Sequence, residues 1–103
     1  MNKEKVLNIL GLAQRAGRLL SGDFVVERSM NRQAYPLLIM AEDCAQNNAN
    51  KYRHLAESHQ VPLRLVGTKE ELGRALGKEM RAVILVNDAG FAKSLLAEID
   101  NNQ

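Results

Sequence analysis

A few side chains in this sequence are of the types that perform catalysis or bind metal ions, namely Asp43, Cys44, His54, His59 and Asp88. His54 and His59 are five residues apart on one expected helix, so they point to different faces, and no HExxH-type spacing is present for a metal ion. Cys44 stands near an expected helix start, where a thiol pKa can fall, although an inert half-buried thiol is the commoner case. No nucleophile, base and orienting group come together. We therefore expect no enzyme, no metal and no cofactor.

The two aspartates have a simpler interpretation as helix caps. Asp43 precedes Gln46 by three residues, which is the spacing of a capping box, and it would open a helix that runs to about His59. Asp88 precedes the last apolar helical pattern in the same way. Both carboxylates are thereby explained without catalysis.

Glycine-containing segments at 11–17 (GLAQRAG) and 72–77 (LGRALG) are weak signals for nucleotide binding. Each lies on or at the end of an expected helix, whereas a phosphate-binding turn follows a strand. Their last glycines are most simply helix C-caps.

The elements that must position these residues alternate between helix and strand. Apolar residues at helical spacing predict a first helix of about 13 residues that ends at Gly17. Continuous apolar runs predict strands buried on both faces. The remaining expected helices begin at Asp23, Asp43, Thr68 and Asp88, and the expected strands cover 18–21, 36–41, 61–66 and 81–86. This order predicts an α/β fold, a three-layer α-β-α sandwich with a mixed four-stranded sheet.

Composition is compatible with one domain over residues 1–103 and with a nucleic-acid partner. There are 14 Lys and Arg against 12 Asp and Glu, a formal charge of +2. One cysteine, no secretion signal and no membrane-length apolar run lead us to expect a cytoplasmic protein without a membrane partner. Exposed aromatics for base stacking are in short supply, so RNA recognition would depend on folded shape and backbone.

Several segments together resemble the ribosomal protein L7Ae/L30e/Gadd superfamily, and more narrowly its bacterial YlxQ-like branch. They read GLAQRAGRLLSGDFVVER, LLIMAEDC, VPLRLVGTKEELGRALGKEMRAVILV and NDAGFA. The resemblance runs from about Ile9 to Ile99 and implies the same sandwich fold. It also implies binding of kink-turn RNA, a sharply bent internal loop with sheared G·A pairs.

The family's recognition segment, G-x-N-E-x-x-K, falls on the start of the second expected helix. Its glycine corresponds to Gly22 and its basic residue to Arg28. Phe24 and Val25 replace the Asn and Glu that read the G·A edges. Asp23 lies between Gly22 and Phe24, and as an anion it suits capping of the helix.

Two further family contacts are implied. One follows the second strand, and the other is the loop before the last strand, which packs against a flipped-out nucleotide. The full set of implied RNA-contacting residues is Gly22, Asp23, Phe24, Val25, Arg28, Glu42, Asp43, Gly77, Lys78, Glu79, Met80 and Arg81.

Two functional hypotheses follow. The first is a non-enzymatic, ribosome-associated protein that recognises folded, kink-turn-like RNA, with structured RNA such as ribosomal RNA and a ribosomal or other protein as partners. The second is a protein-interaction module on the same scaffold, in which Phe24 and Val25 form an exposed apolar patch. The exposure of these two side chains decides whether the second hypothesis is available.

Overall fold

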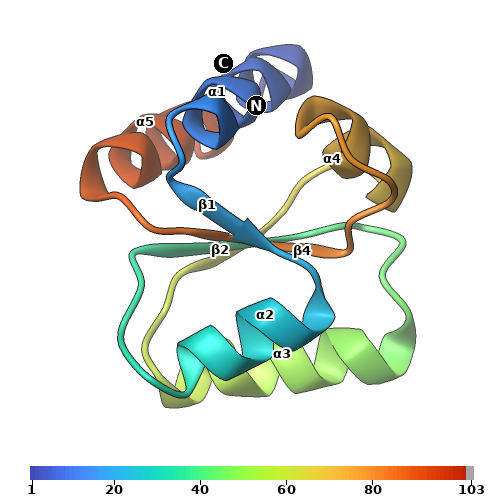
Figure 1. Cartoon of the computed structure of the whole chain (residues 1–103), viewed down its shortest axis with the longest axis vertical. Helices are drawn as coiled ribbons and strands as arrows, with labels where there is room; N and C mark the ends of the chain where they lie inside the picture. Colours follow the sequence, from blue (N-terminus) through green and yellow to red (C-terminus); the bar gives the residue numbers. More distant parts are fainter. Residues whose placement is uncertain (102–103) are drawn as a thin grey trace.

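Helices and strands alternate along the whole chain in the computed structural model, which describes residues 1–101 (Figure 1). The helices are α1 (Lys3–Arg15), α2 (Asp23–Met30), α3 (Gln46–Ser58), α4 (Lys69–Ala75) and α5 (Ala89–Ile99). The strands are β1 (Leu19–Ser21), β2 (Leu37–Met40), β3 (Leu63–Leu65) and β4 (Val83–Val86). The predicted order of elements is confirmed, although the strands are shorter than the apolar runs that predicted them.

The four strands form one mixed sheet in the order β1-β4-β2-β3. β4 is antiparallel to both of its neighbours, whereas β2 and β3 are parallel. In this register Ser21 lies opposite Ile84, and Met40 lies opposite Val83. The ends of β1 and β2 therefore reach the same edge of the sheet at which β4 begins.

Helices cover both faces of the sheet (Figure 1), so the predicted three-layer sandwich is confirmed. Side chains along a strand point alternately to the two faces. Ile84 therefore packs into a core with α1, α4 and α5, while its neighbour Leu85 packs into a second core with α2 and α3. Burial on both faces explains why β2 and β4 are continuous apolar runs rather than alternating ones.

Local capping signals explain the starts of two helices. Thr68 and Glu71 form the predicted capping box of α4, in which the Thr68 side chain accepts from the Glu71 N–H at 3.1 Å. The carboxylate of Asp88 accepts from the Phe91 N–H at 2.8 Å and caps α5 as predicted.

The predicted capping box at Asp43 is wrong. α3 begins at Gln46 with Ala45 as its N-cap, and no side chain caps it. Oδ1 of Asp43 instead accepts from the backbone N–H of Lys69, the first residue of α4, at 2.8 Å. Because β2 and β3 are parallel, the segments that follow them lie at the same end of the sheet. The Asp43 carboxylate therefore bonds to the N–H of Lys69 and not to an N–H at the start of α3.

Asp23 also has a different role from the predicted cap. Gly22 is the N-cap of α2, and Asp23 is the first helical residue. The hydroxyl of Tyr52, which is fully buried in the core between α2 and α3, lies 2.9 Å from Oδ1 of Asp23 and 3.0 Å from its carbonyl oxygen. This hydroxyl therefore joins α3 to the start of α2. Its burial, and to a smaller extent its hydrogen bond with Asp23, raise its pKa well above the ordinary value.

We predict that Tyr52→Phe lowers the free energy of unfolding by about 1–2 kcal/mol, because a buried hydrogen bond to a carboxylate is removed. The raised pKa keeps the folded phenol neutral above pH 10, where the unfolded phenol ionises. The advantage of the wild type over the variant is therefore complete below pH 10 and shrinks above it. Urea denaturation across this pH range measures the difference.

Tyr35→Phe is the matched control, because Tyr35 is only half-buried and its hydroxyl makes no hydrogen bond to the described part of the chain. An equal loss of stability in both variants would contradict the assignment of the Tyr52 hydroxyl.

Candidate nucleic-acid interface

Three segments that the resemblance assigned to RNA contact meet at one edge of the sheet. The N–H of Gly22 donates to the carbonyl of Val83 at 3.3 Å, and the N–H of Ala41 donates to that of Ala82 at 2.8 Å. The corner after β1, the segment after β2 and the loop before β4 are thus held side by side through β4. We call this region, which lies at the end of the sheet where β4 begins, the β4 edge and define it as residues 22–25, 42–43 and 77–81.

Gly22 makes the corner between β1 and α2. Its φ of 98° and ψ of 148° belong to a region that is essentially closed to residues with a side chain. No side chain caps the helix that follows. The first-turn amides of α2 therefore keep their hydrogen-bonding capacity for a partner, at the positive end of the helix dipole.

Arg81 ties the loop to this corner. Its Nε donates to the hydroxyl of Ser21 at 3.2 Å, directly before Gly22. Its guanidinium also donates to the carbonyls of Met80 at 3.1 Å and Glu79 at 3.3 Å. Much of the hydrogen-bonding capacity of this side chain is therefore directed into the fold. Lys78, by contrast, is exposed and has no ion-pair partner within residues 1–101.

Gly73 on α4 lets the loop pack closely against the helix. A Cβ atom at this position would overlap the carbonyl group of Glu79 and lie 2.6 Å from its carbon. The loop backbone consequently occupies the space that a side chain would need, and the position of residues 77–81 depends on this glycine.

The apolar side chains at the β4 edge are exposed. Phe24 is 74% exposed, Val25 42% and Met80 64%. A hollow of about 330 Å³ runs along the outer surface of α2, lined by Phe24, Val25, Arg28, Ser29 and Arg32. The condition that the protein-interaction hypothesis requires is therefore met.

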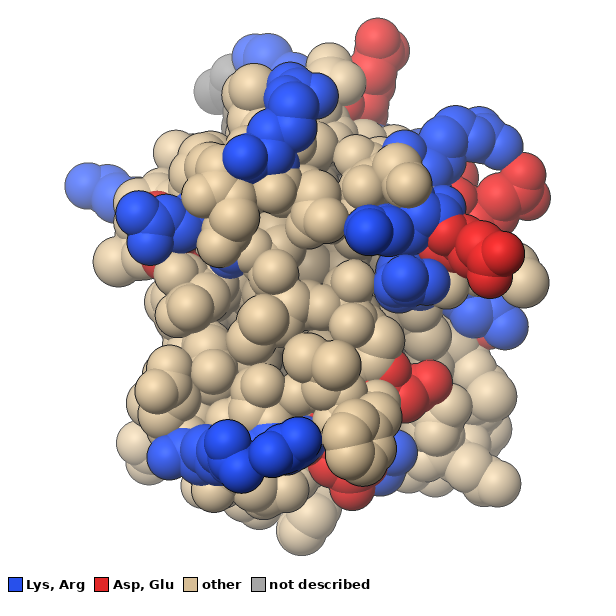
Figure 2. Space-filling view, viewed as in Figure 1, with Lys and Arg blue, Asp and Glu red and all other residues tan. Residues whose placement is uncertain are grey.

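Cationic side chains flank these apolar groups. Figure 2 shows Lys and Arg side chains in a band over α2, and a second group, mixed with acidic side chains, over α4 and its following loop. Arg28 and Arg32 are exposed, and neither has an ion-pair partner in the described part of the chain. In contrast, Arg74 pairs with Glu70 at 2.7 Å.

Glu42 and Asp43 already make hydrogen bonds within the fold. Oε1 of Glu42 accepts from the Gly67 N–H at 3.1 Å, and the Glu42 N–H donates to the Gly67 carbonyl at 2.7 Å. Asp43 holds the start of α4 through Lys69. Both carboxylates thus position the turn between β3 and α4, and their contact with RNA stays a prediction.

The residues considered for catalysis are not brought together. Burial raises the pKa of the Cys44 thiol, and the carboxylate of Asp23 raises it further. This direction is opposite to the lowering that a helix start can produce, and it agrees with the half-buried, inert thiol that the sequence favours. Within residues 1–101, no cluster of three His, Cys, Asp or Glu side chains is placed to hold a metal ion. No described helix has the length and apolar character needed to cross a membrane.

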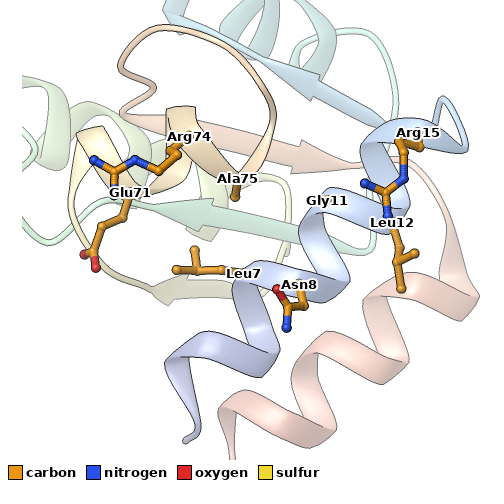
Figure 3. A pocket seen from close by; sticks show the side chains of 8 residues that line it. All are labelled: Leu7, Asn8, Gly11, Leu12, Arg15, Glu71, Arg74 and Ala75. Atoms are coloured by element: carbon orange, nitrogen blue, oxygen red, sulfur yellow. The ribbon is translucent and has the colours of Figure 1, made fainter.

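A second hollow, of about 430 Å³, lies between α1 and α4 on the other face of the sheet (Figure 3). Figure 3 shows Leu7 pointing toward α4 and Arg15 at the far end of α1. Glu71, on the α4 side, is paired with Lys3 at 2.8 Å. Its lining combines Leu7, Leu12 and Ala75 with the polar side chains of Asn8, Arg15, Glu71 and Arg74.

The fold and the β4 edge define the class: a small α/β binding domain that presents an uncapped helix start, exposed apolar side chains and unpaired cations on one surface. The chain belongs to the Ribosomal protein L7Ae/L30e/S12e/Gadd45 family, whose sequence pattern matches residues 4–96. The resemblance stated from the sequence is thereby confirmed.

Curated relatives place the chain near one branch of this family. It is 36% identical over 92 residues to RNA-binding protein YlxQ of Bacillus subtilis (strain 168), covering 89% of this chain and 92% of that protein. It is 29% identical over 92 residues to RNA-binding protein YlxQ of Enterococcus faecium, covering 89% and 88%. These matches confirm the YlxQ-like branch.

Solved structures support the fold. A protein with unknown function from Bacillus halodurans C has 40% sequence identity and a TM-score of 0.89, with 94% of this chain and 98% of that chain covered. The Giardia lamblia 15.5kD RNA binding protein has 21% identity and a TM-score of 0.78, with 97% and 91% covered. The latter likeness concerns the fold alone.

Sequence reasoning missed three residues of this region. Ser21 and Gly73 act only through partners that are distant in the chain or in a following loop, so no local pattern marks them. Arg32 lies in the turn after α2 and lines the same hollow as Arg28, which no helical spacing in the sequence indicates.

We predict that Gly73→Ala destabilises the protein by about 1–3 kcal/mol, because the added methyl group displaces the Glu79 backbone. Amide chemical shifts across residues 77–81 should change as the loop moves. Urea denaturation and heteronuclear NMR measure the two effects.

Gly11→Ala is the matched control, since Gly11 is also helical and its added Cβ would lie 3.2 Å from a backbone oxygen of Ala75. There the helix preference of alanine, about 0.5–1 kcal/mol, offsets the tight contact. A Gly73→Ala loop that keeps the wild-type shifts would show that the close packing is not required.

Proposed function

We propose that this chain is a non-enzymatic RNA-binding protein that holds folded RNA against the β4 edge. The observation that carries this proposal is the juxtaposition of the uncapped α2 start with the loop of residues 77–81, joined by the Arg81–Ser21 hydrogen bond. The names of the two YlxQ relatives, both RNA-binding proteins, support the same partner.

The chemistry of this surface favours contact with the RNA backbone. Backbone N–H groups at a helix start and the cationic heads of Lys78 and Arg28 are suited to phosphate oxygens. Phosphate contacts set the position and orientation of a protein on RNA, whereas base edges need polar side chains to be read. Phe24 and Val25 offer no such groups. We therefore propose recognition of a bent RNA shape, with the G·A edges of a kink-turn read weakly.

We propose that the folded RNA is ribosomal RNA, because the family includes ribosomal proteins. The loop before β4 offers Met80 as an apolar contact for a displaced nucleotide. Lys78 beside it adds a phosphate contact.

A second candidate is a protein partner that covers the exposed apolar groups. The exposure of Phe24, Val25 and Met80 favours it, since large apolar side chains left exposed on a small domain can mark an interface. This candidate needs no unpaired cations beside the patch, whereas RNA binding does. For this reason we rank RNA first.

We predict that the chain binds a kink-turn duplex more tightly than a straight duplex of the same composition, with affinity for both falling steeply as salt rises. Fluorescence anisotropy titrations over a range of salt concentrations measure this. Equal affinities with a steep salt slope would reduce the proposal to generic RNA binding. No binding to either RNA at low salt would overturn it in favour of the protein partner.

We predict that Lys78→Ala weakens RNA binding and flattens the salt slope by about 0.9, the value for a single phosphate neutralised on a duplex. Because Lys78 has no ion-pair partner in the described fold, the stability of this variant should be unchanged. Arg81→Ala should weaken binding as well, but with a lower free energy of unfolding, since it removes three hydrogen bonds donated by the guanidinium.

Lys93→Ala is the control for charge, because Lys93 is an exposed cation of α5 on the other side of the sheet. If Lys78→Ala and Lys93→Ala bind RNA alike, residues 77–81 are not part of the interface.

A further inference from the structure

The outer face of α2 and the turn after it continue from the β4 edge as a line of three residues. Phe24 and Arg28 are four residues apart on α2, so they lie one above the other on the same side of the helix. Phe24 and Arg28 are separated by about 6 Å along the helix axis. Arg32 lies in the turn that follows α2. The hollow along α2 contains all three residues. We call them the α2 stripe.

The acidic residues of α2 are turned away from this stripe. The carboxylate of Asp23 accepts from the Tyr52 hydroxyl, and Glu27 pairs with Lys51 at 3.1 Å, so both face α3. Val26 and Met30 face the core. Packing therefore separates the charges of this short helix and leaves its solvent face cationic, as the band over α2 in Figure 2 shows.

Phe24 is the one aromatic side chain that the fold of residues 1–101 leaves largely exposed. The chain has two Phe, two Tyr and no Trp. Tyr52 is fully buried, while Tyr35 and Phe91 are half-buried and pack against the two cores. Phe24, at 74% exposed, stands at the end of the stripe that adjoins the β4 edge.

An exposed ring beside unpaired guanidinium groups matches the chemistry of single-stranded RNA. Every base has a face that can stack on an aromatic ring, and its backbone brings phosphates for the cations. An apolar protein partner would use the ring but would leave two arginines without counter-charges. Charge complementarity therefore selects RNA as the occupant.

From these observations we infer that the α2 stripe binds an unpaired segment of RNA. This segment extends from the folded RNA held at the β4 edge, with one base stacked on Phe24 and its backbone beside Arg28 and Arg32. This inference rests on the proposed function and adds a second kind of RNA contact to it. The replacement of Asn and Glu by Phe24 and Val25 then exchanges reading of base edges for stacking on a base face.

The test compares three forms of one structured RNA duplex: blunt, extended by a short unpaired adenine flank, and extended by an abasic flank of the same length. The abasic flank keeps the phosphates and lacks the bases. Wild-type protein should bind the adenine-flanked RNA on the order of tenfold more tightly than the abasic one. The abasic-flanked RNA should in turn bind more tightly than the blunt duplex. The flank is placed at either end, and the better end is used for the variants.

Variants at two positions separate the contributions of ring and charge. Phe24→Ala should bring the ratio of adenine-flanked to abasic-flanked affinity to about one, and Phe24→Tyr should restore the preference. Arg32→Ala should weaken both flanked RNAs and lower their salt slope by about 0.7, the value for one contact to a single strand. Leu12→Ala and Lys93→Ala are the controls, as exposed apolar and cationic residues of α1 and α5, and should match the wild type.

The outcomes distinguish this inference from the function on which it rests. If the wild type binds the blunt duplex and gains nothing from either flank, the inference is overturned and the proposed function stands. A preference for adenine that survives in Phe24→Ala also overturns it. If no RNA is bound at low salt, both fall.

Discussion

The position of β4 at the centre of the sheet is the constraint on which the rest of the molecule depends. It bonds antiparallel to β1 on one side and to β2 on the other, so the segments that end those strands lie beside its first residues. Arg81 stands just before that point, and its guanidinium reaches Ser21 across the gap between loop and corner. The same strand also divides the two cores, since Ile84 and Leu85 point to opposite faces.

The packing of α2 then decides the electrostatic character of the surface. Asp23 and Glu27 are engaged by Tyr52 and Lys51 of α3. The opposite side of the helix keeps Arg28, next to an exposed phenylalanine. A chain with a formal charge of +2 thereby keeps an unpaired arginine in the last turn of the same helix whose first-turn backbone amides are uncapped.

The sequence predicted most of the fold and part of the site. Burial on both faces of the sheet requires a continuous apolar run, so the sequence predicts β2 and β4 directly. The Thr68–Glu71 capping box is a local pattern, and it was found as well. Asp43 has the same local pattern, but a backbone N–H of α4 takes its carboxylate instead. Arg81 reads as one of several surface cations, although its hydrogen bonds hold the loop.

By itself the sequence determined which segments are helix and which are strand, the class of fold and the family, because these depend on periodicity, capping residues and motifs within short stretches of chain. Only the tertiary structure decided which polar side chains are engaged inside the fold and which stay available to a partner. The reason is the separation of the partners along the chain: 26 residues for Asp43 and Lys69, 29 for Tyr52 and Asp23, and 60 for Arg81 and Ser21. No local pattern encodes contacts over such distances. The cationic face of α2 therefore becomes visible only after the acidic side chains have found their partners.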